Sequence, residues 1–158
     1  MNRKYTVNEF EDLIGRIKKE IPSIRLTTDV IVGFPGESKD DFEKTLGLAK
    51  RIKFQMIYIG KYSPREYAIS SKFEDDVPQE EKKERENILK DEVNKMRKQF
   101  HEEFVGKKME ILVTGGRRGL SYYYHEVLFE KPLPKEKIGT FVEALVTDST
   151  LSGLVAKG

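Results

Sequence analysis

The sequence predicts an α/β segment joined by one long helix to a small β-rich barrel. A strand–helix–strand pattern lies in the first part of the chain, and a highly charged helical pattern follows it. Short β-like runs separated by Gly and Pro then continue to the last residue. We therefore expect an α/β plus β fold with three parts, at residues 1–76, 77–104 and 105–158.

The first part is predicted to open with a helix and then a strand. Thr6 and Glu9 have the spacing of a capping box, and Pro22 lies just beyond the expected helix end. The run IRLTTDVIV, residues 24–32, is rich in β-branched side chains and predicts a largely buried strand.

A second helix and a second strand complete a βαβ unit. Ser38 offers an N-cap with Asp41 three residues on, and FQMIYI at residues 54–59 is strand-like. This order implies two parallel strands joined by a right-handed crossover. Two strands leave open sheet edges, so we expect them to be covered by a second copy in a homodimer or by sequence missing from this chain.

The long helix is expected from Val77 to about Phe104, with Pro78 in its first turn. Its thin apolar stripe comprises Ile88, Leu89, Val93, Met96 and Phe100. Charges of both signs fill the rest, which is typical of a solvated face on a connecting helix. The runs after Gly106 predict a small antiparallel, OB-like barrel.

Composition excludes several classes of site. The chain has no cysteine and two histidines, so it can form no disulfide and no cysteine-held zinc or iron–sulfur site. His101 and His125 are expected to be structural, and no metal site is predicted. The net charge is +2, so any nucleic-acid surface must be local. No apolar run or signal peptide indicates a membrane or export, which favours the cytoplasm.

Polar residues and glycines gather near the predicted strand ends. Asp29 lies within an apolar strand and needs a partner if buried; it is either paired with Arg3 or Arg25, or it accepts hydrogen bonds from ligand hydroxyls. The loop that follows, comprising Gly33, Phe34, Pro35, Gly36 and Glu37, is either a plain turn or a ligand-binding loop before a helix N-terminus. Tyr62 and Arg65 follow the second strand at the equivalent edge, where Arg65 is either an exposed loop residue or a contact for a carboxylate or phosphate.

The tail contains a basic turn beside aromatic residues. Arg117 and Arg118 precede a run of three tyrosines, in which alternation places Tyr122 and Tyr124 on one face. Such residues can hold phosphates and stack on bases, and the alternative is a solubilising turn beside core tyrosines.

Read in order, the motifs MNRKYT, TTDVIVGFPGES, YSPR and VPQEEKKERENIL and the β-rich tail resemble the radical-SAM methylthiotransferases. That family adds a methylthio group to a tRNA adenosine next to the anticodon, or to a ribosomal protein. The tail resembles the TRAM domain, an RNA-binding barrel. The resemblance covers the whole chain but less than half of a family member. The family's internal MNR methionine coincides with Met1, so we expect a truncated protein or a product started at an internal methionine.

The resemblance implies a partial radical-SAM barrel in which S-adenosylmethionine lies near Arg3, Asp29 and the Gly33–Glu37 loop. The family's 4Fe–4S clusters are held by cysteines upstream of the residues present here. This chain alone is therefore expected to hold no catalytic residue and to bind no cofactor. Glu66-Tyr67-Ala68 replaces the Pro-Gly-Thr that usually follows YSPR, so nothing is carried over past Arg65.

These patterns predict the carboxy-terminal part of a tRNA methylthiotransferase, of which this chain retains at most RNA binding. Its expected partners are tRNA and the missing amino-terminal portion of the enzyme. A non-catalytic RNA-binding module and part of a ribosomal-protein methylthiotransferase are the alternatives.

Overall fold

The computed structural model describes residues 4–158, which divide into two compact units, one extending to Val93 and the other from Asn94 to Gly158. Helix α3 (Gln79–Glu102) contributes residues to both units, and we describe each unit by itself. The predicted boundaries after residues 76 and 104 remain a proposal about domain organisation. Within residues 4–158, no helix has the length and apolar character needed to cross a membrane.

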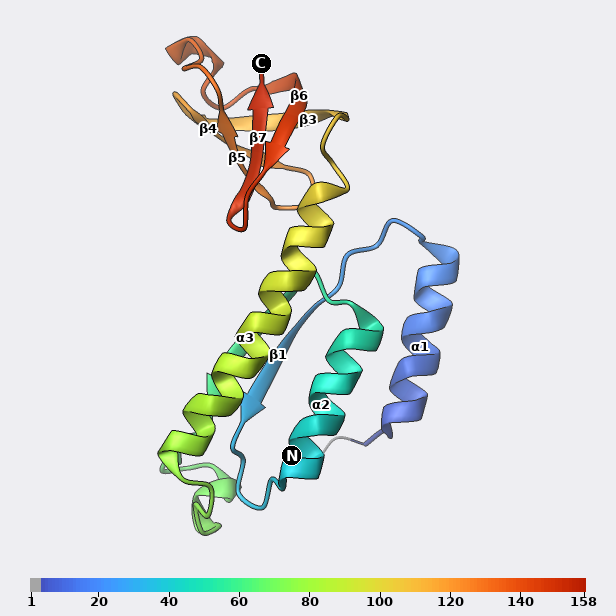
Figure 1. Ribbon diagram of the computed structural model, residues 1–158, viewed down its shortest axis with the longest axis vertical. Coiled ribbons are helices and arrows are strands. Elements are labelled where there is room, and N and C mark those ends of the chain that lie inside the picture. The colour runs from blue at the N-terminus through green and yellow to red at the C-terminus, as the bar shows by residue number, and fades with distance from the viewer. Residues whose placement is uncertain (1–3) are drawn as a thin grey trace. The chain divides into compact units, whose positions relative to one another are not determined.

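The first unit contains the predicted βαβ arrangement (Figure 1). Its elements are α1 (Val7–Glu20), β1 (Thr27–Val32), α2 (Lys39–Ile52), β2 (Met56–Lys61), the 3-10 helix η1 (Ile69–Lys72) and the start of α3. The strands β1 and β2 are parallel, as predicted, and their register runs from Thr27 opposite Met56 to Val32 opposite Lys61.

Both predicted capping boxes are present. The Thr6 hydroxyl accepts a hydrogen bond from the Glu9 amide at 3.3 Å, and the Ser38 hydroxyl accepts one from the Asp41 amide at 3.1 Å. Each carboxylate in turn accepts from the backbone amide of its cap residue. Such caps stabilise a helix by about 1 kcal/mol each, so the starts of α1 and α2 are determined locally by sequence.

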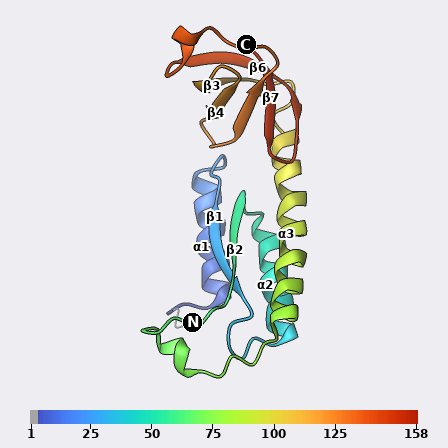
Figure 2. The same cartoon turned by 90° about the vertical axis from the view of Figure 1, so that its left-hand side faces the viewer.

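The prediction of a largely buried first strand is wrong, because β1 alternates. Val32 is fully buried, whereas Thr27, Asp29 and Ile31 are exposed. Their side chains share a face with Tyr58 of β2, which is 61% exposed and lies opposite Asp29. The helices of this unit lie on the other face of the sheet (Figures 1 and 2). The sheet is thus covered on one side by the described residues and open on the other.

The buried face of α3 is not purely apolar. In the first unit it carries Lys82 and Arg85, which are 0% and 5% exposed, followed by Leu89 and Val93. The expectation that the helix charges are solvated is therefore wrong at these two positions. Ile88, predicted to lie in the apolar stripe, is 40% exposed.

The second unit is a closed barrel with strand order β3-β4-β5-β7-β6. Its elements are β3 (Lys108–Gly115), β4 (Arg118–Ser121), β5 (Glu126–Phe129), the 3-10 helix η2 (Lys135–Lys137), β6 (Phe141–Ser149) and β7 (Gly153–Lys157). The OB-like barrel was correctly predicted, but it is mixed, because β5 and β7 pair in parallel. Its core includes Ile111, Val113, Phe129, Val146 and Ala156, each at most 1% exposed.

Gly153 allows the parallel strands to approach each other. A Cβ atom added at this glycine would lie 2.1 Å from the Glu126 carbonyl oxygen, which is a backbone atom and cannot swing aside. Gly153 lies opposite Glu126 at the start of the β5–β7 pair. Any side chain here would push β7 away from β5 and open the barrel at that point.

We predict that Gly153→Ala destabilises the barrel by roughly 1–3 kcal/mol, the usual range for overpacking. The measurement is chemical denaturation followed by far-ultraviolet circular dichroism. Gly116→Ala is the matched control, since nothing lies within 4 Å of a Cβ added there. Equal stability of Gly153→Ala and the natural chain would contradict the close approach.

Candidate functional site

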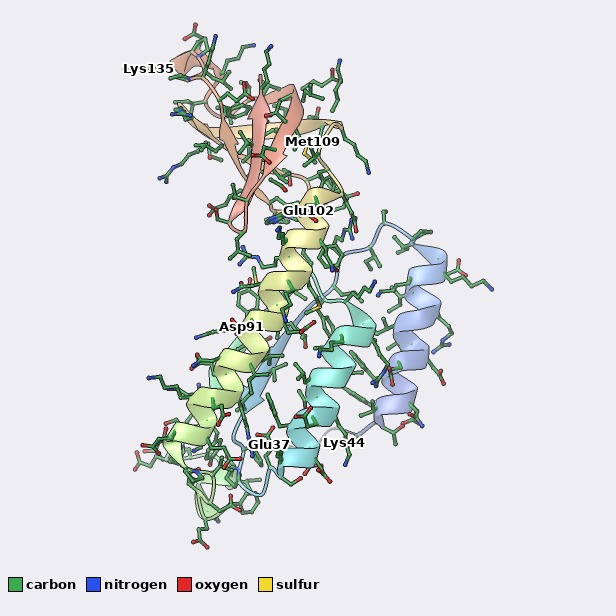
Figure 3. The ribbon with its side chains drawn as sticks, viewed as in Figure 1. Glu37, Lys44, Asp91, Glu102, Met109 and Lys135 are labelled. Carbon is green, nitrogen blue, oxygen red and sulfur yellow. The ribbon has the colours of Figure 1, made fainter. Side chains whose placement is uncertain are left out.

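The loop between β1 and α2 has a glycine backbone conformation at two positions and is held by hydrogen bonds to its amides. Gly33 and Gly36 have φ angles of 68° and 79°, which side-chain-bearing residues rarely adopt. The Glu37 amide donates to the Phe34 carbonyl at 2.8 Å, and the Gly36 amide donates to the Asp76 carboxylate at 2.8 Å. The Glu37 carboxylate folds back to accept from the Gly33 amide. Figure 3 labels Glu37 in this loop.

Arg85 of α3 is hydrogen-bonded to the same loop. Its guanidinium donates to the Glu37 carbonyl at 3.0 Å and to the Glu37 carboxylate, and it also pairs with Glu81. Burial opposes the charge, but the hydrogen bonds with Glu37 and Glu81 outweigh it, so the pKa of Arg85 lies above its ordinary value. The Glu37 side chain is only 11% exposed and is occupied by internal contacts.

Lys82 fills the space above Gly33. A Cβ atom added at Gly33 would lie 2.3 Å from the Lys82 Cγ atom, so the lysine stem takes the volume that a side chain would need. The buried ammonium group pairs with Asp75 and lies 5.3 Å from the centre of the Tyr62 ring. Tyr62 is itself buried, and its hydroxyl donates to the Ser70 carbonyl at 2.8 Å.

A pocket of about 610 Å³ lies beside this loop in the first unit. Asp29 and the loop residues from Phe34 to Glu37 line it, together with Tyr5 and Phe10 near the start of the chain. Gly33 and Tyr62 are not among the lining residues, and their described contacts are with Lys82 and its neighbours. Arg65 is exposed in the connection after β2, and Arg3 lies outside the described residues.

The sequence therefore predicted the loop but missed the residues of α3 that hold it. Lys82 and Arg85 continue the i, i+3, i+7 spacing that leads to Leu89, and this spacing was the available signal. Asp75 and Asp76, just before α3, supply the carboxylates for Lys82 and for the Gly36 amide. Asp76 and its partner Gly36 are 40 residues apart in the sequence, so periodicity alone could not identify this contact.

A second candidate surface lies on the barrel. A groove of about 500 Å³ runs across β4, β5 and β7, between Arg118 after the β3–β4 turn and Thr150 and Ser152 in the β6–β7 turn. The β4–β5 connection of the same unit carries Tyr122 and Tyr124, which are 85% and 82% exposed. Tyr123 between them is half-buried, but the three tyrosines lie in the turn between β4 and β5, and Tyr124 has a φ angle of 61°, so the predicted strand alternation does not orient them.

The two predicted arginines are placed differently. Arg118 is exposed and lines the groove. The Arg117 guanidinium instead donates to the backbone carbonyls of Phe129 and Glu130, at 3.0 and 3.1 Å. Arg117 thus ties the β3–β4 turn to the end of β5, which leaves Arg118 as the better placed cation for a ligand in the groove.

His101 and His125 are buried and meet edge to face, with ring centres 4.8 Å apart. The His101 Nδ1 atom lies 2.7 Å from the Thr150 carbonyl oxygen, so Nδ1 is the donor. Burial lowers the pKa of His101, the hydrogen bond to Thr150 opposes this, and the nearby Arg97 adds to the lowering. Within residues 4–158, no cluster of three or more His, Asp or Glu side chains is suited to a metal ion.

Comparison with known proteins identifies relatives that share one name. The chain is 45% identical over 115 residues to the tRNA-2-methylthio-N(6)-dimethylallyladenosine synthase of Acetivibrio thermocellus, covering 73% of this chain and 24% of that protein. It is 36% identical over 165 residues to the protein of the same name from Oceanobacillus iheyensis, covering 99% of this chain and 32% of that protein. No protein-family model matches the chain.

The matched region is the carboxy-terminal part of these relatives, and the chain spans between about a quarter and a third of their length. The chain belongs to the family of tRNA methylthiotransferases, which is the family that the sequence motifs predicted.

The residues of this chain fit only part of what such chemistry requires. Without a cysteine, the chain offers no thiolate for an iron–sulfur cluster, so no step through a cluster can be assigned to its residues. A nucleotide-like ligand fits better, because the pocket beside Asp29 combines an exposed carboxylate with aromatic side chains. Gly36 adds an open backbone face, since nothing lies within 4 Å of a Cβ built there.

We predict that the barrel loses stability as the pH falls below about 6.5, the ordinary pKa of histidine. Because the folded pKa of His101 is lowered, the unfolded chain binds protons first. This contribution is therefore complete above the unfolded pKa and is lost as the pH falls toward the folded one. Denaturation at several pH values would show the loss, and His101→Gln would reduce the slope. An unchanged slope in that variant would contradict this role of His101.

Proposed function

We propose that the barrel of this chain binds single-stranded RNA, and tRNA in particular. The groove across β4, β5 and β7 is the observation that carries this proposal, because in OB-like barrels this strand face and its flanking turns hold oligonucleotides. The tRNA-modifying names of the relatives add the class of RNA.

The chemistry of the groove suits a nucleic-acid strand. Arg118 supplies a planar cation for phosphate, and Thr150 and Ser152 supply hydroxyls at the opposite end. Tyr122 and Tyr124 offer exposed rings on the β4–β5 connection, where unpaired bases could stack. The barrel needs no strong overall positive field for such a local contact.

The whole protein is proposed to methylthiolate a tRNA adenosine, as the names of its relatives indicate. S-adenosylmethionine and iron–sulfur clusters held by other residues would supply the radical and sulfur chemistry. In this chain, Asp29 is suited to accept hydrogen bonds from the ribose hydroxyls of the cofactor, and Phe34, Pro35 and Gly36 would line its pocket. Arg3 and Arg65 are retained as predicted cofactor contacts, and residues 105–158 as a TRAM-like domain.

The open sheet face is the proposed contact for the rest of the enzyme. Ile31 and Tyr58 are exposed apolar side chains on it, and the described residues leave it uncovered. The amino-terminal portion of a family member is the proposed partner, and a homodimer is the alternative. A ribosomal-protein substrate is less well supported, since the relatives are named for tRNA.

We predict that the chain binds an unmodified tRNA anticodon stem-loop with an affinity that falls as salt rises. Replacing both Tyr122 and Tyr124 with Ala should weaken binding by at least about 30-fold, since each stacked base contributes about 1–3 kcal/mol and about 1.4 kcal/mol corresponds to a factor of ten. Arg118→Ala should weaken binding and reduce its salt dependence. Fluorescence anisotropy at several salt concentrations measures both effects.

The controls for RNA binding are matched by residue type. Tyr67→Ala removes a tyrosine that is 93% exposed in the other unit, so it should leave binding unchanged. Arg117→Ala should lower the stability of the barrel, because its guanidinium holds two backbone carbonyls. Absence of binding at low salt, or equal loss in the Tyr67 variant, would reject the groove as the RNA site.

We predict that S-adenosylmethionine binds weakly to a pocket preformed in this chain. Asp29→Asn should reduce the affinity of the chain for this ligand by about tenfold, as expected for the loss of a hydrogen bond to a charged group. Isothermal calorimetry measures the affinity. Asp40→Asn, a substitution of an exposed aspartate on α2, is the control. No binding by the natural chain would show that the pocket requires residues from outside this chain.

A further inference from the structure

We propose that Arg85 and Lys82 of α3 are positioning residues that hold the Gly33–Glu37 loop in its ligand-presenting shape. Neither residue is among the lining residues of the pocket, and both are almost fully buried behind the loop. The predicted cofactor site is thereby extended to a helix for which the sequence predicted a connecting role and solvated charges.

A chain of hydrogen bonds runs from Arg85 to the loop backbone. Arg85 donates to the Glu37 carboxylate, and that carboxylate accepts the Gly33 amide hydrogen. Arg85 also holds the Glu37 carbonyl at 3.0 Å, so both ends of this glutamate are restrained. Without Arg85, the Glu37 carboxylate would be left partly buried with no cation beside it, and it would turn toward water.

Lys82 restrains the loop sterically. The stem of Lys82 occupies the space above Gly33, which has a positive φ angle and no side chain of its own. An apolar residue of similar length could fill this space, but Lys82 also carries an ammonium group to Asp75. Asp76, the next residue, accepts the Gly36 amide hydrogen at 2.8 Å. Lys82 therefore links Gly33 to the segment in which Asp76 accepts the hydrogen bond from the Gly36 amide.

Together these contacts determine which atoms the loop presents. Gly33 is covered by the Lys82 stem and the Glu37 carboxylate is held by Arg85, while residues 34–37 line the pocket. The restraint needs no ligand, so the loop is set before binding. Only the identity of the ligand, S-adenosylmethionine, rests on the proposed function.

The test is amide hydrogen exchange of this chain, read residue by residue by nuclear magnetic resonance. We expect Arg85→Met and Glu37→Met each to accelerate exchange of the Gly33 amide by at least about tenfold, with β1 and barrel amides unchanged. The double variant should show no further acceleration, because both changes break one chain of contacts. Lys82→Met should instead accelerate the Gly36 amide through Asp75 and Asp76.

Lys90→Met is the matched control on the same helix. Lys90 is 52% exposed and pairs with Glu86 at i, i+4, so its removal should leave both glycine amides unchanged. An unchanged Gly33 amide in Arg85→Met, or protection lost evenly through β1 and α2, would overturn the positioning role. If Arg85→Met does not fold, Glu37→Met, which removes the acceptor, tests the same hydrogen bond from the loop side.

A ligand measurement separates this proposal from the proposed function. If the natural chain binds S-adenosylmethionine, Arg85→Met should weaken binding about tenfold or more while the barrel melts at the same temperature. Unchanged affinity would overturn the functional part of the positioning role. If the natural chain does not bind the ligand, the cofactor proposal fails for this chain, and the exchange experiment still decides whether α3 sets the loop.

Discussion

The first unit depends on the burial of one lysine. Lys82 has no exposed surface, and a charged group can remain there only because Asp75 accompanies it. Its stem requires a glycine at position 33, and its ammonium group requires the aspartate just before α3. These requirements join the end of β1, the segment before α3 and the first turns of α3 into one packed arrangement. The shape of the loop and the environment of Tyr62 follow from it.

Local patterns predicted the elements well, because local physics determines them. The capping boxes at Thr6 and Ser38 are satisfied within four residues of chain, and the βαβ order leaves little choice of topology. Which side chains are buried was harder to predict from the sequence. The apolar run around Asp29 looks buried on both faces, yet only side chains such as Val32 point toward the helices. Which face is covered depends on residues distant in sequence, and periodicity does not contain that information.

The candidate sites show the same division. Exposure of Tyr122 and Tyr124 comes from the short turn between two neighbouring strands, which is a local property, rather than from the strand alternation that the sequence predicted. The different roles of Arg117 and Arg118 could not be predicted, because the carbonyls that engage Arg117 come from the end of β5. Likewise, the glycines of the Gly33–Glu37 loop suggested close approach by a ligand, whereas at Gly33 the approaching group is Lys82. A glycine in a loop signals that something lies close to it without identifying what.

The position of β7 in the barrel has a consequence for synthesis. This strand lies between β5 and β6, so the barrel cannot close until residues 153–157 have left the ribosome. Until then, β5 and β6 each present an unpaired edge, and the core side chains Phe129 and Val146 lack their cover. During this interval, the exposed strand edges of nascent chains on neighbouring ribosomes of one messenger RNA can pair with each other. Such pairing competes with closure of the barrel.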